Sequence, residues 1–459
     1  MTAPRAIAPS PISARAVARP RRESLPLLFL GGHAILAVAL APGGSAPLAT
    51  VHAVLAFLVA LHLTLTAPRR WAVAGAAYIV ACEVAWRMTG AQVPWEVGKY
   101  ASTLLLSIAL LRLRPRARWR ALPMLYMVAQ LPSIGVLLAR PSLTIARIRD
   151  MVSFNLSGPL SLAVAAWYLS HIEIDEEQAR RVMFAIIGPI LTTGGITLLR
   201  TLTATDLQFV AESNFATSGG FGPNQVSSIL GLGAFLAVLL TLRSRAPLRL
   251  AWLVPGIALF LALQAALTLS RGGLYAAGLA TVAAALCMLR DHRVQRRALG
   301  VGVPALLLAT ALIVPRIDAF TGGALSERFA DRESSGRADI LAEDVRIWRE
   351  HPVLGVGPGA AADERRTEST VAHTEYSRLL AEHGALGVAA LVVLGLMSVG
   401  VVRRGLRSPD GAIAAGLLVW SLASMAHAGM RLAAFGLVFG LAQARFTSRR
   451  GADAGRAGR

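Results

Sequence analysis

Repeated apolar blocks of about 16–22 residues constrain the fold of this chain more strongly than any other feature of its sequence. A helix of that length crosses the roughly 30 Å hydrocarbon core of a bilayer. Lipid offers no hydrogen-bond partner to a backbone N–H or C=O, so each crossing segment must be helical. The sequence therefore predicts an all-α fold, a polytopic transmembrane helix bundle.

Composition agrees with a membrane domain and argues against several soluble classes. The chain is 55% hydrophobic and 16% charged, whereas soluble domains carry about a quarter charged residues. The net charge of +20 does not indicate nucleic-acid binding, because the arginines lie between apolar blocks and not on one polar face. Cys82 and Cys287 both lie inside apolar blocks. We expect them to be small buried hydrophobes, not disulfide or zinc ligands.

We expect about 12–14 spans, because several candidates are short or interrupted by Gly or Pro. The candidate spans are residues 25–41, 48–66, 71–86, 97–111, 121–139, 152–170, 182–199, 224–242, 250–269, 272–289, 298–315, 385–402, 411–428 and 432–446. The predicted regions are a basic tail (1–24), the main bundle of about eleven spans (25–315), one large polar loop (316–384), the C-terminal spans (385–446) and a second tail (447–459).

The arginines of the short loops predict the orientation, since cytoplasmic loops carry an excess of Lys and Arg. Most of them fall on the side of the two tails, so we expect both termini in the cytoplasm and the 316–384 loop outside it. No trusted cleavage site follows the start, which favours a cytoplasmic tail over a cleaved signal. Arg140, Arg147 and Arg149 run against the rule, and one miscounted span upstream would explain them.

Parts of the large loop have helical patterns. Residues 339–350 place Leu341, Val345 and Trp348 on one face, which predicts an amphipathic helix that ends at His351–Pro352. Glycines then predict a tight turn over 355–359.

A second helix is expected over about 374–382, leading to Gly384 and the next span. We interpret Glu375 and Glu382 as solvated charges on this helix.

Two arginines on the predicted outer side are candidates for binding an anion. Arg271 lies in a hairpin between two spans, where it either snorkels to the surface or clamps a phosphate with its forked guanidinium. Arg337 falls in the first turn of the 339–350 helix. A cation there is locally unfavourable unless something negative binds, although a plain surface arginine is the alternative.

Three further residues are candidates on the same side. His373 can take a proton from a hydroxyl, although a structural histidine is the more common case. Tyr376 follows it closely, and Asn224 ends a Phe-Gly-Pro-Asn segment at the start of a span, which is either a plain helix start or a kink facing substrate.

No nucleotide or metal motif is present in the sequence, so we expect no cofactor and no metal. The acidic run 173–177 lies on the predicted cytoplasmic side, and we interpret it as a solvated loop.

Five segments in order resemble the O-antigen ligase and Wzy-type polysaccharide polymerase superfamily. They are FGPN (221–224), SRGG (270–273), SGRADI (335–340), HPVLGVGPG (351–359) and HTEYSRLLAEHGALG (373–387). The similarity covers roughly 220–445. The chain departs from many members at Thr374, where they have Asn, and at Leu341, where they have Trp.

The resemblance implies metal-independent glycosyl transfer at a bacterial inner membrane, with an undecaprenyl-diphosphate-linked glycan as donor and the active loop in the periplasm. Arg271 and Arg337 would hold the diphosphate as catalytic residues, and His373 would activate the acceptor hydroxyl as general base. Asn224 and Tyr376 would line the substrate site. The implied partners are the lipid-linked donor, a glycan or lipid A-core acceptor, and the bilayer, with no nucleic acid.

Three functions remain open from the sequence. The first is a polymerase that joins repeat units, and the second is a ligase that moves finished glycan to lipid A-core or to protein. A transporter or flippase is the alternative of another class. It is less favoured because few charges lie at mid-span, Glu83 among them, while the polar candidates gather at one membrane face.

Overall fold

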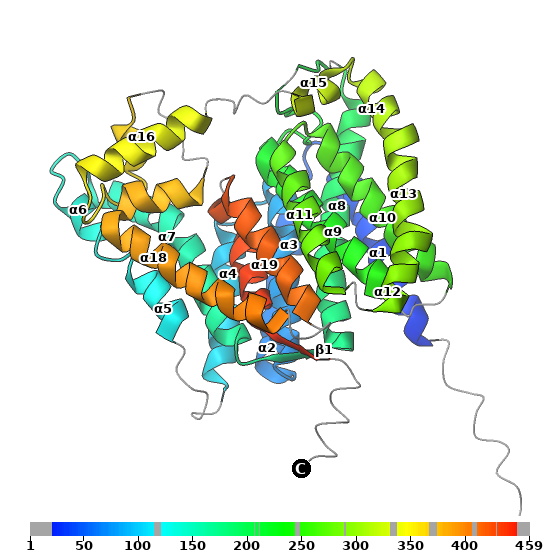
Figure 1. Cartoon of the computed structure of the whole chain (residues 1–459), viewed down its shortest axis with the longest axis horizontal. Coiled ribbons are helices and arrows are strands. Elements are labelled where there is room, and N and C mark those ends of the chain that lie inside the picture. The colour runs from blue at the N-terminus through cyan, green and yellow to red at the C-terminus, as the bar shows by residue number, and fades with distance from the viewer. Residues whose placement is uncertain are drawn as a thin grey trace, which may run out of the picture.

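A computed structural model describes residues 21–113, 121–205, 207–210, 212–243, 248–288, 291–330, 337–366, 374–405, 411–427 and 429–447. It shows a bundle of helices crowned at one end by shorter helices (Figure 1). The α-helices are α1 (Arg21–Leu40), α2 (Ala46–Thr66), α3 (Arg70–Met88), α4 (Val97–Leu111), α5 (Ala121–Val128), α6 (Ile134–Leu138), α7 (Ile145–Leu169), α8 (Glu176–Thr203), α9 (Pro223–Arg243), α10 (Leu248–Leu267), α11 (Arg271–Met288), α12 (His292–Arg297), α13 (Val303–Leu308), α14 (Val314–Phe320), α15 (Ala324–Ala330), α16 (Arg337–Glu350), α17 (Ala361–Glu364), α18 (Glu375–Gly405), α19 (Gly411–Met425) and α20 (Ala433–Gln443). The remaining elements are two π-helical turns, η1 (Ala298–Gly302) and η2 (Ala309–Ile313), one 3-10 turn, η3 (Gly429–Arg431), and two short strands, β1 (Glu173–Asp175) and β2 (Arg445–Thr447).

The predicted all-α polytopic class is confirmed. Among the residues that the structure describes, six helices, α2, α7, α8, α9, α11 and α18, are long and apolar enough to cross a membrane. Shorter apolar helices include α4, α19 and α20. In the described part of the chain the only strands are β1 and β2, which pair in parallel.

Hydrogen bonds identify the two ends of the bundle. At one end, the Arg200 guanidinium donates to the carbonyls of Ala41, Met88 and Gly219. Ala41 follows α1, Met88 ends α3, and Gly219 lies in the turn before α9. At the opposite end, the Tyr168 hydroxyl donates to the Arg69 carbonyl, and β1 pairs with β2. Successive helices alternate between these ends, as crossing segments must.

Small residues allow the central helices to approach closely. A Cβ on Gly436 of α20 would lie 2.8 Å from the Leu162 backbone nitrogen of α7, and one on Gly416 of α19 would meet Phe235 of α9 at 2.7 Å. Close packing of this kind stabilises helix association in lipid, because burying apolar surface there contributes little free energy to association. The central bundle therefore rests on shape complementarity between helices.

One predicted span is broken in the structure. Residues 121–139 form α5 and α6, separated by a turn that contains Pro132. Proline disfavours the helical conformation of the residue before it. Gln130 and Ser133 of this turn are fully buried, so tertiary contacts stabilise the break.

A second predicted span, 298–315, is irregular. It consists of η1, α13, η2 and the first residues of α14. Pro304 and Pro315 each remove a backbone donor, and such sites favour π-helical turns. The apolar pattern therefore predicted a helical segment here without revealing its distorted backbone.

The acidic run 173–177 is more ordered than predicted. Its first three residues form β1, and the Asp175 side chain caps α8 by accepting from the Gln178 backbone N–H at 2.8 Å. The Gln178 side chain accepts from the Asp175 N–H in return, which completes a capping box. Asp175 is exposed, as predicted for a solvated run, but the run is not a loop, because it forms a short strand and the Asp175 carboxylate caps α8.

Candidate functional site

The FGPN and SRGG segments are joined directly. The Ser270 hydroxyl donates to the Asn224 side-chain oxygen at 2.7 Å, and the Ser227 hydroxyl donates to the Ser270 carbonyl at 2.7 Å. Asn224 lies in the first turn of α9, and Ser270 immediately precedes α11. Two segments that are about 45 residues apart in the sequence therefore form one polar surface at the ends of two packed helices.

Close approach explains the two glycines of SRGG. A Cβ on Gly273 would lie 2.1 Å from the Ser227 carbonyl oxygen, and one on Gly272 would lie 2.2 Å from the ring of His427. The His427 Nε2 is 3.3 Å from the Ser228 hydroxyl. His427, in the connection after α19, was missed by the sequence analysis. The signal available was a histidine in a short connection between two spans.

Arg271 begins α11 beside this cluster. Its Nη1 donates to the Arg328 carbonyl at 3.0 Å, and the Arg328 guanidinium donates to the Leu269 carbonyl at 3.3 Å. Leu269 has a φ of 53°, which is rare for a residue other than glycine. The turn before Arg271 is thus held by α15, and the arginine lies half-buried with its position fixed.

A cap of short elements, which we call the roof (α16, the turn 351–359 and α17), covers one edge of the same end of the bundle (Figure 1). α16 docks through a buried ion pair, in which the Arg365 Nη2 lies 2.5 Å from the Asp344 carboxylate. The Ser377 hydroxyl of α18 donates to the other Asp344 oxygen at 2.6 Å. The amphipathic helix is confirmed, but its predicted buried face was wrong. Ile340, Asp344 and Ile347 are buried, whereas Leu341 is 45% exposed, because the ion pair at Asp344 rotates the docked face.

The HPVLGVGPG turn wraps a kink in α18. Gly384 has φ 59° and ψ −133° and interrupts the helix. The Val356 and Gly357 N–H groups donate to the carbonyls of Ala381 and Glu382, at 3.1 and 3.0 Å, and the Ala385 N–H donates to the Pro352 carbonyl at 2.7 Å. The predicted second helix is thus confirmed, and it runs on into the span through this kink.

Segments around α6 support the roof from below. The His383 Nδ1 lies 2.5 Å from the Ser133 hydroxyl. The Arg140 Nη2 donates to the Val356 carbonyl at 3.1 Å and pairs with Glu364 at 3.0 Å. Arg140, which runs against the positive-inside rule, therefore has a structural role at the roof end.

The interpretation of Glu375 and Glu382 as solvated charges was wrong. They are 4% and 3% exposed. The Arg378 guanidinium bonds both, through Nε to Glu375 at 2.7 Å and through Nη1 to Glu382 at 2.8 Å. Glu375 also accepts from the Met430 N–H at 3.0 Å, which ties α18 to η3. Their burial follows from the roof, which covers this stretch of α18.

One ionised group on the outer side of the roof orders the chain that follows. The Glu343 carboxylate accepts hydrogen bonds from the Arg346 side chain and the Arg366 backbone, which lowers the pKa of Glu343. Glu343 is therefore ionised at neutral pH and holds Arg366, the last described residue before His373, against α16.

The other predicted site residues have different outcomes. The Tyr376 hydroxyl donates to the Leu422 carbonyl at 2.8 Å, so this phenol braces α18 against α19. Arg337 begins α16, but its side chain lies outside the described part of the structure. His373 also lies outside the described residues, which resume at Thr374, where the hydroxyl accepts from the Ser377 N–H at 3.1 Å and caps α18. Within the described ranges, no three metal-binding side chains come close enough to hold a metal ion.

These features define a polytopic membrane protein with polar groups gathered at one end of a helix bundle, beside a helical roof. Residues 256–392 match the family described as O-Antigen ligase. That stretch, less than half of the chain, contains SRGG, α16 and the HPVLGVGPG turn. This match supports the resemblance of the chain to the O-antigen ligase and Wzy-type polymerase superfamily, whose members are enzymes. A search of the curated proteins finds no match.

Proposed function

We propose that this protein transfers glycan from an undecaprenyl diphosphate carrier to an acceptor hydroxyl at the roof end of the bundle. The observation that carries the proposal is the direct bond between Asn224 and Ser270, which fixes the start of α11, where Arg271 lies, in a polar cluster at the same end of the bundle as the roof. A lipid-linked donor suits this arrangement, because its tail needs the membrane and its charged head needs a polar site at the membrane edge.

In the proposed reaction the acceptor oxygen attacks the anomeric carbon of the donor sugar. The bond from that carbon to the diphosphate oxygen breaks, and the diphosphate leaves with the electron pair. His373 takes the acceptor proton as general base. Arg271 and Arg337 bind the phosphate oxygens and stabilise the growing charge, so we expect the transfer to proceed without a metal ion.

We place this site on the periplasmic face of a bacterial inner membrane, with both termini in the cytoplasm. Support comes from the two ends of the bundle. Arg69 accepts from the Tyr168 hydroxyl at the end that carries β1 and β2, and its guanidinium donates to the Arg112 carbonyl, so these two loop arginines lie at that end. The roof lies at the other end, which is therefore the face poor in short-loop arginines.

Our first choice of activity is polymerisation of O-antigen or exopolysaccharide repeat units on the carrier. Ligation of finished glycan to lipid A-core or to protein is the second candidate, and the description of the matching family, O-Antigen ligase, favours it. Both activities use the same donor, so the residues at the roof end serve either one. The acceptor distinguishes them.

Deleting the gene in its host and following glycan length and carrier on gels separates these activities. A polymerase predicts that the deletion leaves single repeat units and that the wild-type gene restores the ladder. A ligase predicts that long chains persist on undecaprenyl diphosphate while the acceptor stays bare. A deletion that leaves both length and carrier unchanged sinks the proposal. Full complementation by His373→Ala would remove that histidine from the mechanism.

A further inference from the structure

Arg87 is the centre of a polar network that none of the family motifs contains. Its side chain is 4% exposed and pairs with Glu83 at 2.7 Å. It also donates to the side-chain oxygen of Gln225, the residue after FGPN, and to the Arg431 carbonyl, both at 3.1 Å. One guanidinium therefore joins α3, the start of α9 and η3 next to the Asn224–Ser270 pair.

The same guanidinium fixes Trp95 in the connection between α3 and α4. Its Nε and Nη2 donate to the Trp95 carbonyl at 3.0 and 2.8 Å, and its centre lies 4.7 Å from the indole ring centroid. Phe221, the first residue of FGPN, lies 6.0 Å from the same ring. The indole is nevertheless 53% exposed. One side of this indole therefore covers the buried Arg87 guanidinium, while the rest of the ring is exposed.

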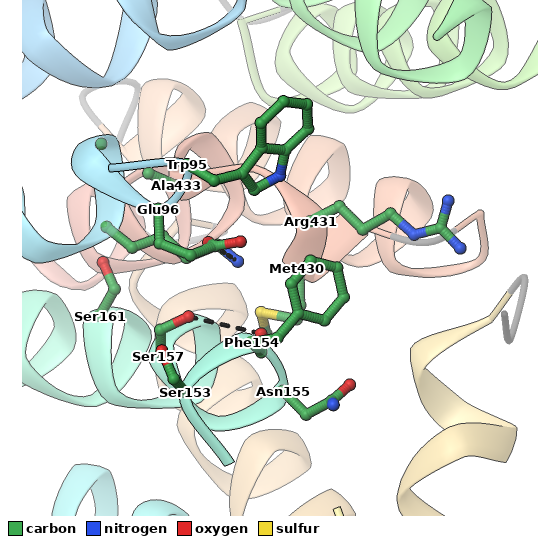
Figure 2. A network of polar contacts seen from close by, with 12 residues as sticks. Trp95, Glu96, Ser153, Phe154, Asn155, Ser157, Ser161, Met430, Arg431 and Ala433 are labelled. Carbon is green, nitrogen blue, oxygen red and sulfur yellow. Dashed lines mark hydrogen bonds and ion pairs between the residues drawn. The ribbon is translucent and has the colours of Figure 1, made fainter. Parts of the chain in front are cut away.

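Arg431 and Trp95 are linked through Arg87, whose guanidinium donates to both of their backbone carbonyls. Among the residues that the structure describes, none forms a hydrogen bond or ion pair with the Arg431 guanidinium, although the side chain is half-buried. Figure 2 shows this side chain extending away from Glu96, Ser157 and Ser161, with the Trp95 ring above it in the view. Glu375 attracts Arg431 electrostatically, but the Glu375 carboxylate is already paired with Arg378 at 2.7 Å and accepts from the Met430 N–H. A half-buried arginine without a hydrogen-bonded partner favours an anionic ligand.

We propose that Trp95 and Arg431 form a subsite for a glycosyl phosphate, meaning a sugar ring together with the phosphate joined to it. Trp95 supplies a rigid face for the sugar at low entropic cost, and Arg431 forks onto phosphate oxygens. The inference rests on the proposed function, since the first sugar of a lipid-diphosphate donor has this chemistry. Neither Trp95 nor Arg431 belongs to the five motif segments, and the Arg87 network links both of them to FGPN.

Binding to the purified full-length protein in nanodiscs tests the subsite. The probes are a short-chain polyprenyl diphosphate carrying one N-acetylglucosamine and the same polyprenyl diphosphate without sugar. Arg431→Gln should weaken binding of both probes by on the order of tenfold or more, because both contain the phosphates. Trp95→Ala should weaken only the sugar-bearing probe, by a similar factor. The Arg431 guanidinium has no hydrogen-bonded partner among the described residues, so Arg431→Gln should keep the wild-type melting temperature. Trp95→Ala keeps the carbonyl that binds Arg87 and loses only the ring contacts with Arg87 and Phe221, so its melting temperature should fall slightly.

Matched controls make the outcomes distinct. Trp252→Ala removes another exposed indole, which is 70% exposed in α10, and Arg149→Gln removes an exposed arginine of α7. Both variants should bind the probes like wild type.

The subsite alone is overturned if the wild-type protein binds the probes and both Arg431→Gln and Trp95→Ala bind them with wild-type affinity. A wild-type protein that binds neither probe overturns the subsite and the proposed function together. If Trp95→Ala weakens the binding of both probes equally, the indole does not stack on the sugar.

Discussion

Arg271 is positioned by contacts that the SRGG segment does not itself contain. The turn before it is held by the Arg328 guanidinium of α15, and Ser270 is held by Asn224 of α9. Glycine at 272 and 273 is required because His427 and the Ser227 carbonyl occupy the space of a side chain. A lone arginine in a hairpin therefore becomes a fixed cation at the site.

Arg271→Lys tests whether the fork of this side chain matters beyond its charge. An ammonium keeps the charge but cannot bind two phosphate oxygens in parallel, so we expect glycan transfer to fall by about 10- to 100-fold. Transfer is measured as turnover of lipid-linked glycan by the purified protein. Arg316→Lys, at an exposed site in α14, is the control and should keep normal turnover. Near-normal turnover in Arg271→Lys would exclude a bidentate role.

At the scale of elements, the kink of α18 couples the roof to the bundle. The roof turn bonds the backbone on both sides of Gly384, and the buried Asp344 pair docks α16 on the same helix. The EHG–LG and HPVLGVGPG segments are thus two halves of one structural unit. These two segments contact each other directly in the fold.

Gly384→Ala should displace the roof. Its φ of 59° and ψ of −133° strain any other residue, by about 1–3 kcal/mol. The added Cβ would also lie 2.7 Å from the Gly355 nitrogen and the Val353 carbonyl. We expect a lower melting temperature in detergent and a short or absent glycan ladder in cells. Gly395→Ala in the same helix, where a Cβ meets nothing within 4 Å, should behave like wild type. Equal behaviour of the two variants would show that the kink is dispensable.

At the scale of the whole molecule, buried charges link helices that are distant in the sequence. Lys99 of α4 pairs with Glu96 at 2.5 Å, and both side chains are almost fully buried. Glu83 of α3 accepts from the Ala433 N–H at 2.8 Å, which joins α3 to the start of α20. Serines of α7, including Ser157 and Ser161, lie on the other side of Glu96 (Figure 2). These pairs set the relative placement of the first and last helices.

Lys99→Met should destabilise the protein strongly, because it leaves the buried Glu96 charge with only the more distant Arg87, at 3.8 Å. Breaking such a pair costs about 3–5 kcal/mol. The double variant Glu96→Gln/Lys99→Met removes both charges and should recover most of that loss. The measurement is thermal unfolding of the purified protein in detergent. Additive losses in the double variant would show that the pair is not coupled.

The sequence by itself determined the class of fold, the position of most spans, the amphipathic helix of the loop and the superfamily. Each of these depends on the local length of an apolar block or on a motif that is contiguous in the chain. The break at 130–133 and the buried Glu375 and Glu382 could not be predicted in this way. The sequence of one helix is the same whether water or a distant segment covers its carboxylates, so it does not reveal their burial.

Only the tertiary structure decided which polar groups meet. It joined Asn224 to Ser270, placed His427 against Gly272, and brought Trp95 and Arg431 to the same arginine. Burial of a charge is stable only when a partner is supplied, and here Arg87 receives its partners from α3, the α3–α4 connection, the start of α9 and η3. That pairing depends on how the helices pack, which no single segment of the sequence encodes.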